Sequence, residues 1–171
     1  MTVRPIREIG DPVLRTAADP VRAFDKDLAA LVRDLEDTVD HPGRAGVAAP
    51  QIGVGLRVFS YNVDGVIGHM VNPVLTVLDP VGDEPAVEVT EEGCLSVPGP
   101  YAELERAFRA RVDGVDAHGA PTSIEATGMA ARCLQHEVDH LDGTVYVDLL
   151  PEAPREQLLA EAAGPEGELP A

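Results

Sequence analysis

The spacing of apolar and polar residues predicts a helix near the start of the chain. Between residues 25 and 40 the apolar positions follow helical spacing, which predicts an amphipathic helix with one apolar stripe. These positions are Leu28, Leu31, Val32, Leu35 and Val39. His41-Pro42-Gly43 ends the helix. Residues 1–24 before it are broken by prolines and are predicted to be irregular.

The middle of the chain has the pattern of antiparallel strands separated by turn residues. Asp64-Gly65 is a strong signal for a two-residue hairpin turn, and His118-Gly119 marks a second hairpin. The predicted strands cover residues 56–63, 66–71, 72–78, 87–95, 107–115 and 122–126. Small residues at 46–51 predict a loop held close to another part of the molecule.

A second helix is predicted from Gly128, and Gly143 fits its C-terminal stop. A short strand at 145–147, a weak helix at 151–163 and a frayed tail at 164–171 are expected to follow. Because strands dominate the middle and the helices lie apart from them, the predicted fold class is α+β.

The length and the net charge of the chain exclude several classes of protein. A chain of 171 residues is expected to form one domain, 1–171. It has neither an apolar run of the ~20 residues that a membrane span needs nor a signal peptide, so we expect a cytoplasmic protein with no membrane partner. The net charge of −17 repels phosphate backbones and argues against DNA as a partner.

The segment His136-Glu137-Val138-Asp139-His140 is an H-E-x-x-H motif. On a helix His136 and His140 lie one turn apart on the same face, so both imidazoles can reach one metal ion. Glu137 lies beside them and can contact a water molecule there. By chance the pattern should arise in only about one chain in a few hundred of this length, so it favours metal-dependent hydrolysis.

A catalytic metal site needs a third protein ligand and an open position for water. Downstream candidates such as Asp142 and Asp148 match no known pattern. Upstream, Cys94 offers a thiolate, which is a good ligand for a divalent metal, although Cys94 taken alone also fits a buried core cysteine. With no secretory signal, a disulfide between Cys94 and Cys133 is not expected.

Three motifs follow one another along the chain: residues 44–51 (RAGVAAPQ), residues 92–96 (EGCLS) and residues 135–140 (QHEVDH). Together with Asp11-Pro12-Val13-Leu14-Arg15 near the start, they resemble the peptide deformylase family, which carries G-x-G-x-A-A-P-Q, E-G-C-L-S and H-E-x-D-H. The resemblance implies antiparallel β-sheets packed around a central metal-binding helix, with an N-terminal helix and a short C-terminal helix. About residues 151–171 would form an acidic helix and tail of the single catalytic domain.

The resemblance also implies an activity and a site. The protein would remove the N-formyl group from the N-terminal formylmethionine of newly made polypeptides and release formate. Cys94, His136 and His140 would bind Fe(II), which zinc, nickel or cobalt can replace. Glu137 would act as the base, and the Gln51 side chain with the Leu95 N–H would stabilise the oxyanion.

Substrate contacts are expected on two sides of this site. Gly46 has no Cβ, so a peptide strand can approach its backbone and pair with it. Met129 and Cys133 follow the ligand face of the helix and are expected to form a methionine pocket. The stem of Arg132 either joins them or points outward. Glu92 could orient a ligand imidazole, pair with Arg106, or be an exposed acid.

The chain departs from the family pattern at three places. Arg44 stands at the first glycine of motif one, and Tyr101 stands where some members have a basic residue that contacts substrate. The third place is the tail, because residues 151–171 contain five glutamates and only one arginine. Some members instead have a basic C-terminal helix by which they dock on the ribosome. We expect a monomer that acts on nascent formylmethionyl peptides, and a transient contact with the ribosome stays open.

Two other functions remain to be separated from this one. A zinc peptidase that cuts internal peptide bonds would need a third ligand downstream of His140 and would keep its metal without Cys94. A binding module that has lost its activity would not need Glu137, Gln51 and three intact ligands.

Overall fold

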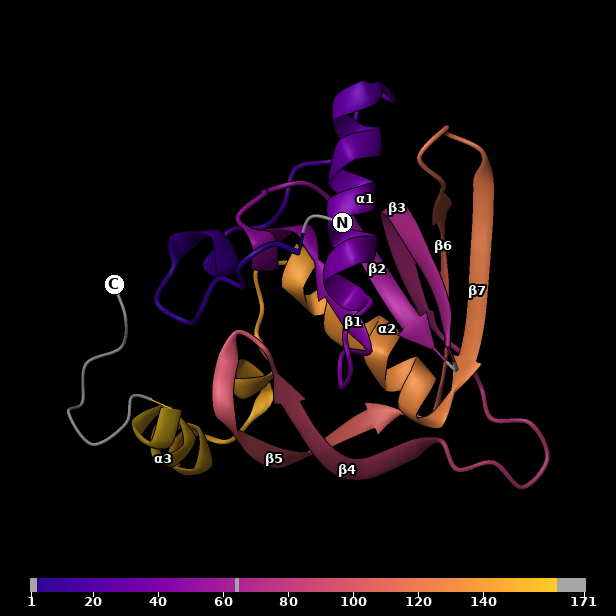
Figure 1. Ribbon diagram of the computed structural model, residues 1–171. Helices are drawn as coiled ribbons and strands as arrows, with labels where there is room; N and C mark the ends of the chain where they lie inside the picture. Colours follow the sequence, from indigo (N-terminus) through magenta and orange to yellow (C-terminus); the bar gives the residue numbers. More distant parts are fainter. Residues whose placement is uncertain (1–2, 64, 163–171) are drawn as a thin grey trace.

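A computed structural model describes residues 3–63 and 65–162 (Figure 1). Five antiparallel strands form the larger sheet in the order β1-β2-β3-β6-β7. Their bounds are Gly46–Ala48 (β1), Val58–Val63 (β2), Val66–Val77 (β3), Arg109–Val115 (β6) and Pro121–Thr127 (β7). A second sheet has two antiparallel strands, β4 (Val87–Cys94) and β5 (Val97–Ala107).

The described residues also form three α-helices: α1 (Lys26–Val39), α2 (Gly128–Leu141) and α3 (Glu152–Ala162). Short 3-10 helices lie at Pro12–Arg15 (η1), Ala49–Ile52 (η2) and Tyr146–Leu149 (η3). This architecture confirms the predicted α+β class, with antiparallel sheets around a central helix. No helix in the described part of the chain is long and apolar enough to cross a membrane.

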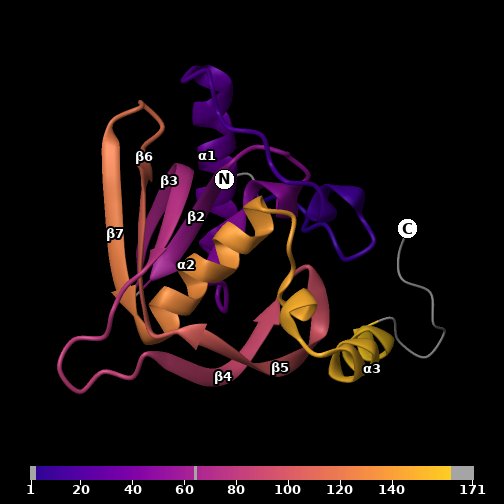
Figure 2. The same ribbon diagram turned by 180° about the vertical axis from the view of Figure 1, so that it is seen from behind.

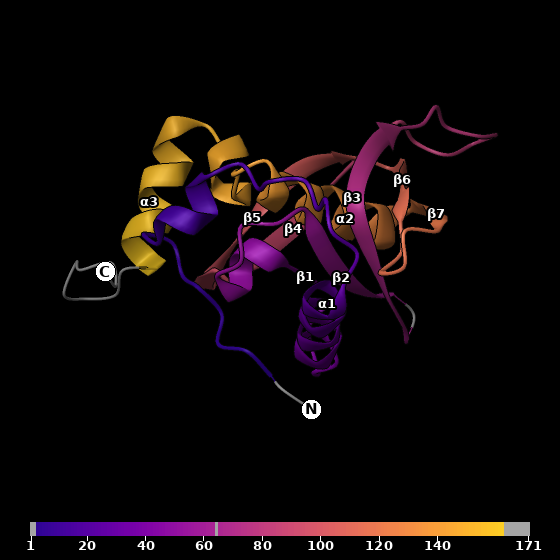
Figure 3. The same ribbon diagram turned by 90° about the horizontal axis from the view of Figure 1, so that it is seen from above.

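The helices α1 and α2 cover opposite faces of the larger sheet (Figure 3). Successive side chains on a strand point to opposite faces. Val58 therefore packs with the apolar stripe of α1, whereas its neighbour Phe59 packs with Leu134 and Val138 of α2. The side chain of Asp25 begins α1 by accepting hydrogen bonds from the backbone N–H groups of residues 27 and 28.

The β4–β5 ribbon lies on the other side of α2 from the larger sheet (Figures 1 and 2). A separate apolar cluster joins this ribbon to the C-terminal segment, where Tyr146 is fully buried and Leu158 of α3 packs beside β5. The helix α2 is thus enclosed by sheet on two sides, which places its polar ligand face next to the end of β4.

Both predicted hairpins are present. Val63 pairs with Val66, and Gly65 has a φ of +78°, the left-handed conformation that favours glycine in a hairpin turn. Val115 pairs with Pro121 in the second hairpin. The long strand β3 changes register between Val71 and Val74, which explains why the sequence suggested two strands there.

Some sequence predictions were wrong. The segment 145–147 is not a strand, because the backbone N–H of Val145 donates to Asp148 Oδ2 at 2.9 Å and turns the chain into η3. Strand β5 was missed, since Pro98, Gly99 and Pro100 hide its alternation. The expected loop at 46–51 is β1 followed by η2, and the irregular start contains η1. The predicted tail at 164–171 lies outside the described residues.

Candidate metal centre

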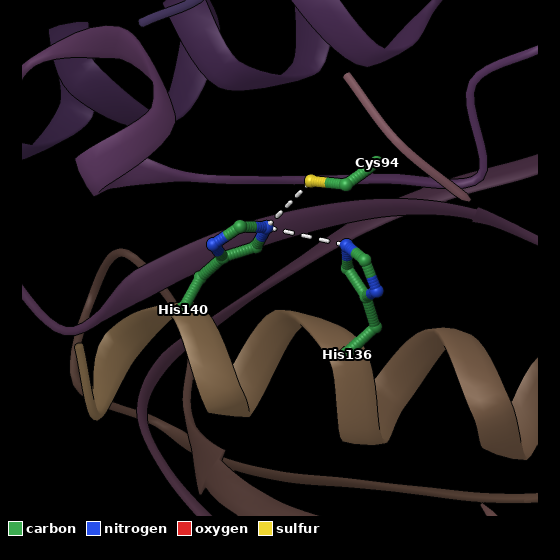
Figure 4. Close-up of side chains that lie close together, drawn as sticks. All are labelled: Cys94, His136 and His140. Atoms are coloured by element: carbon green, nitrogen blue, oxygen red, sulfur yellow. Dashed lines mark hydrogen bonds between the residues drawn. The ribbon is translucent and has the colours of Figure 1, made fainter. Parts of the chain in front are cut away.

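Three side chains from two distant parts of the chain meet between α2 and the β4–β5 ribbon. Cys94 ends β4, just before the two-residue turn Leu95-Ser96, and His136 and His140 lie one turn apart on α2. Cys94 Sγ lies 3.2 Å from His140 Nε2, which lies 3.2 Å from His136 Nε2 (Figure 4). All three ligand atoms lie within 4.8 Å of one another. The structure therefore brings together the three predicted ligands.

Glu92 determines which nitrogen of His136 is free. Its Oε1 lies 2.7 Å from His136 Nδ1, so Nδ1 carries the proton and Nε2 presents its lone pair to the site. Glu92 and Cys94 lie two residues apart on β4, which turns both toward α2. Glu92 therefore both orients a ligand imidazole and pairs with Arg106. The third alternative, an exposed acid, is wrong, because Glu92 is buried.

Two buried arginines hold Glu92 in place. Arg106 donates through Nε and Nη2 at 3.1 and 2.7 Å, and Arg132 donates through Nη1 at 2.8 Å. Burial raises the pKa of Glu92, but His136 and Arg106 outweigh burial and hold it well below the usual range. Arg106 also bonds Asp139 at 2.6 Å, a link between β5 and α2 that the sequence did not indicate.

The donors suit a divalent transition metal. Burial would raise the pKa of the Cys94 thiol, but the neighbouring His140 and His136 reverse this and hold it well below its ordinary value. A thiolate and two imidazole nitrogens form a donor set typical of zinc and of related first-row metals. His140 Nε2 lies close to both other ligand atoms. One proton cannot satisfy three lone pairs that converge in this way, whereas one metal cation can bind all three.

Glu137 lies next to the ligands with a free carboxylate oxygen. The side chain is 2 % exposed, and Oε2 has no hydrogen-bond partner among the described residues. Burial is the main cause that raises the pKa of Glu137 to about 7. A carboxyl group with such a pKa can take up and release a proton near neutral pH, which fits the predicted base.

Gln51 of η2 reaches the site from the opposite side. Its Oε1 accepts a hydrogen bond from the Ala48 N–H at 2.8 Å, which fixes the amide. Its Nε2 lies 3.6 Å from Cys94 Sγ and 3.3 Å from Ser96 Oγ. Gln51 is 1 % exposed, so it is not a solvent-facing loop residue, and its N–H donor points at the centre.

A pocket of about 540 Å³ opens beside the three ligands. Of the residues predicted for metal binding, catalysis or substrate binding, its lining includes all except the metal ligand His140: Gly46, Gln51, Cys94, Leu95, Met129, Cys133, His136 and Glu137. Met129 is 62 % exposed and lies at the mouth. Arg132 is buried and does not point outward, since its guanidinium also donates to the carbonyls of Glu88 and Leu104.

The missing side chain of Gly46 has a consequence that the sequence did not indicate. The direction in which a Cβ would point is filled by the side chain of Glu137, so the missing Cβ makes room for this carboxyl group. Sequence reasoning also missed Tyr146, whose buried ring stacks near His136 with centroids 6.4 Å apart. No signal marked this residue, because its segment was taken for a strand.

A thiolate, two imidazoles and a buried carboxyl group around one pocket define a metal-dependent hydrolase. The family model described as polypeptide deformylase matches residues 3–156. The peptide deformylase of Acidothermus cellulolyticus is 49 % identical over 168 residues, which cover 98 % of this chain and 89 % of the relative. That of Parafrankia sp. is 50 % identical over 151 residues, covering 88 % and 80 %.

The fold agrees with the sequence comparison. A crystal structure of a peptide deformylase from Legionella pneumophila has a TM-score of 0.84 at 35 % identity, covering 99 % of this chain and 100 % of its own. The chain belongs to the peptide deformylase family. The expected activity, metal-dependent removal of the formyl group from the N-terminal formylmethionine of new polypeptides, is confirmed by this membership.

Proposed function

We propose that the enzyme holds Fe(II) through Cys94, His136 and His140 and uses Glu137 as its base. Zinc, nickel or cobalt can take the same place. The observation that carries this proposal is the buried Oε2 of Glu137, which lacks a partner among the described residues and stands beside three converging ligand atoms. An oxygen in that position has no structural bond to keep and is available for proton transfer.

Different residues of the pocket carry out different parts of the reaction. When bound, the metal acts as a Lewis acid and lowers the pKa of water at the site. Glu137 takes the proton of the attacking water and then gives it to the amine nitrogen as the formyl C–N bond breaks, so that formate and a free amine leave. The Gln51 amide and the Leu95 N–H donate to the developing oxyanion, and losing one such donor costs roughly 3–4 kcal/mol.

The substrate enters beside α2 in this proposal. Gly46 on β1 pairs with the peptide main chain, and Met129 with Cys133 receives the methionine side chain. The enzyme acts as a monomer in the cytoplasm on nascent formylmethionyl peptides. Glutamates on α3 face solvent and repel ribosomal RNA, so we expect any contact with the ribosome to be transient.

The rival peptidase lacks a third ligand in the described part of the chain. Asp142 bonds Arg57 at 2.7 Å. Asp148 pairs with Arg15 and Arg155 and accepts the Val145 N–H. These carboxylates lie in other ion pairs, and neither belongs to the group of converging ligand atoms. The non-enzymatic rival conflicts with the intact base and donors.

Formate release from a formyl-Met peptide tests the proposal. Protein prepared without metal is loaded anaerobically with Fe(II) or with zinc, and both the metal content and the rate are measured. We expect one metal ion per chain, a fast Fe(II) form and a slower zinc form. A Cys94→Ser variant should lose most of its metal affinity. Equal metal binding by that variant, or an inactive Fe(II) form, would contradict the proposal.

A further inference from the structure

An exposed aromatic ring stands at the rim of the metal pocket. Tyr101 on β5 lines the pocket although 69 % of it is exposed. Its ring covers Gly93 on β4, since a Cβ at Gly93 would stand 2.6 Å from the Tyr101 Cδ1 atom. The absence of a side chain at position 93 therefore allows the ring to lie flat across the ribbon, one residue away from the ligand Cys94.

The segment that carries the ring is anchored to the core. The hydroxyl of Tyr146 donates to the carbonyl of Pro100 at 3.0 Å, and Tyr146 is itself 1 % exposed and stacked near His136. The backbone next to Tyr101 is thus tied to the residue that packs against a metal ligand. Anchoring the backbone next to the ring reduces the conformational freedom that is lost when a ligand covers the ring.

Uncompensated negative charge lies beside the ring. Glu91 also lines the pocket and lies on the exposed face of the β4–β5 ribbon, directly opposite Glu103. Neither carboxylate has a salt-bridge partner within residues 3–63 and 65–162. Like charges in this position destabilise a strand pair, and a cation between them and the ring would remove the cost.

The path of the substrate brings its next side chains to this rim. With the formyl group at the metal ligands and the methionine beside Cys133, the chain must leave through the mouth of the pocket. Successive residues of an extended peptide advance by about 3.3 Å, so the two residues after the methionine pass between the rim with Glu91 and Tyr101 and the rim with Arg44.

We propose that Tyr101 is a specificity-determining residue that binds the side chain of one of these two substrate residues and, with Glu91 beside it, favours lysine or arginine. An aromatic face attracts a cation, and a neighbouring carboxylate adds to the attraction. The inference rests on the proposed function, because it assumes that the formyl group lies at the three ligands. It makes the enzyme selective beyond the methionine, through Tyr101 and Glu91.

Peptides that differ at one position test this inference. The two series are formyl-Met-X-Ala and formyl-Met-Ala-X, with X as lysine, norleucine or glutamate, and kcat and KM are measured with the Fe(II) enzyme at low and high salt. In one series we expect KM for lysine to be about three- to tenfold below that for norleucine. KM for glutamate should be higher still, and high salt should reduce the differences.

Variants separate the contribution of the aromatic ring of Tyr101 from that of the charge of Glu91. Tyr101→Ala should remove most of the lysine advantage by raising KM more than it lowers kcat, and Tyr101→Phe should keep the advantage because the ring remains. Glu91→Gln should weaken it and reduce its salt dependence. Glu105→Gln is the matched control, since Glu105 lies on the same exposed face opposite Val89 and does not line the pocket; its kinetics should equal those of the wild type.

The outcomes are distinguishable. Equal KM values for lysine, norleucine and glutamate in the wild type would overturn the inference, as would an unchanged lysine advantage in a folded, metal-loaded Tyr101→Ala variant. A preference for glutamate that disappears in Arg44→Gln would assign the contact to the opposite rim and overturn it too. If the Fe(II) enzyme hydrolyses none of these peptides, the proposed function itself has failed.

Discussion

Gly46 on β1 lies directly against the side chain of Glu137 on α2. A Cβ at Gly46 would stand 2.6 Å from the Glu137 Cδ atom and 2.7 Å from its Cγ atom, distances that no real side chain tolerates. The larger sheet and the central helix therefore meet at the proposed base, and the position of the Glu137 carboxyl group depends on a glycine about ninety residues earlier in the chain.

The first prediction follows from this contact. Gly46→Ala should push the Glu137 carboxyl group away from the ligands and lower kcat by roughly ten- to a hundredfold, because proton transfer depends on hydrogen-bond reach. Metal content should stay near that of the wild type. Gly55→Ala is the control, since nothing lies within 4 Å of its added Cβ. Wild-type kcat in a metal-loaded Gly46→Ala variant would contradict the prediction.

The second prediction concerns Glu137 itself. Glu137→Gln keeps the shape of the side chain but cannot take a proton, so turnover should fall by at least about a hundredfold. The three ligands do not change, and metal analysis should still find one ion per chain. Formate release is the measurement. Near-normal turnover would remove Glu137 from the mechanism.

The metal ligands and the base could be predicted from sequence because the geometry of a helix is local. His136 and His140 lie four residues apart, and their spacing alone places them on one face of α2. Cys94 is different: only the resemblance joined it to the histidines, since its place depends on how the β4–β5 ribbon packs against α2. The pattern of residues 97–107 failed to show half of that ribbon, because prolines interrupt it.

The surroundings of the ligands were harder to predict. Whether Glu92 is exposed or buried depends on Arg106 from β5 and Arg132 from α2, which no local pattern brings together. Similarly, a glycine at position 46 indicates freedom of approach, but only the structure shows that the free space is occupied by Glu137. Residue types at fixed spacing thus predicted the chemistry, and long-range packing determined how it is held.

The third prediction tests the buried ion network. Glu92→Gln leaves Arg106 and Arg132 buried with one carboxylate fewer, and Asp139 compensates only Arg106. The free energy of unfolding should fall by about 3–5 kcal/mol, and metal affinity should fall roughly 10- to 100-fold because the acceptor of His136 loses its negative charge. Urea unfolding of the metal-free protein and competition with a chelator measure the two effects separately.

A matched control for this variant is Glu125→Gln. Glu125 pairs with Arg109 on the exposed side of the β6–β7 hairpin, and an exposed pair contributes only about 0–1 kcal/mol. Its unfolding and metal affinity should stay close to the wild type. If Glu92→Gln were as stable as this control, the two arginines would not depend on Glu92 for their burial.

The last prediction tests the methionine pocket. Cys133 lines the pocket, is 7 % exposed, and its Sγ lies 3.2 Å from the carbonyl of Ala45 on the segment that leads into β1. Cys133→Phe should fill the space for the first side chain and raise KM for formyl-Met peptides far more than it disturbs metal binding. Cys133→Ala is the control, because it loses the contact with Ala45 but leaves the pocket open, so its KM should change little. A folded, metal-loaded Cys133→Phe enzyme with an unchanged KM would place the methionine elsewhere, since a ring at this position and a methionine side chain cannot occupy the same part of the pocket.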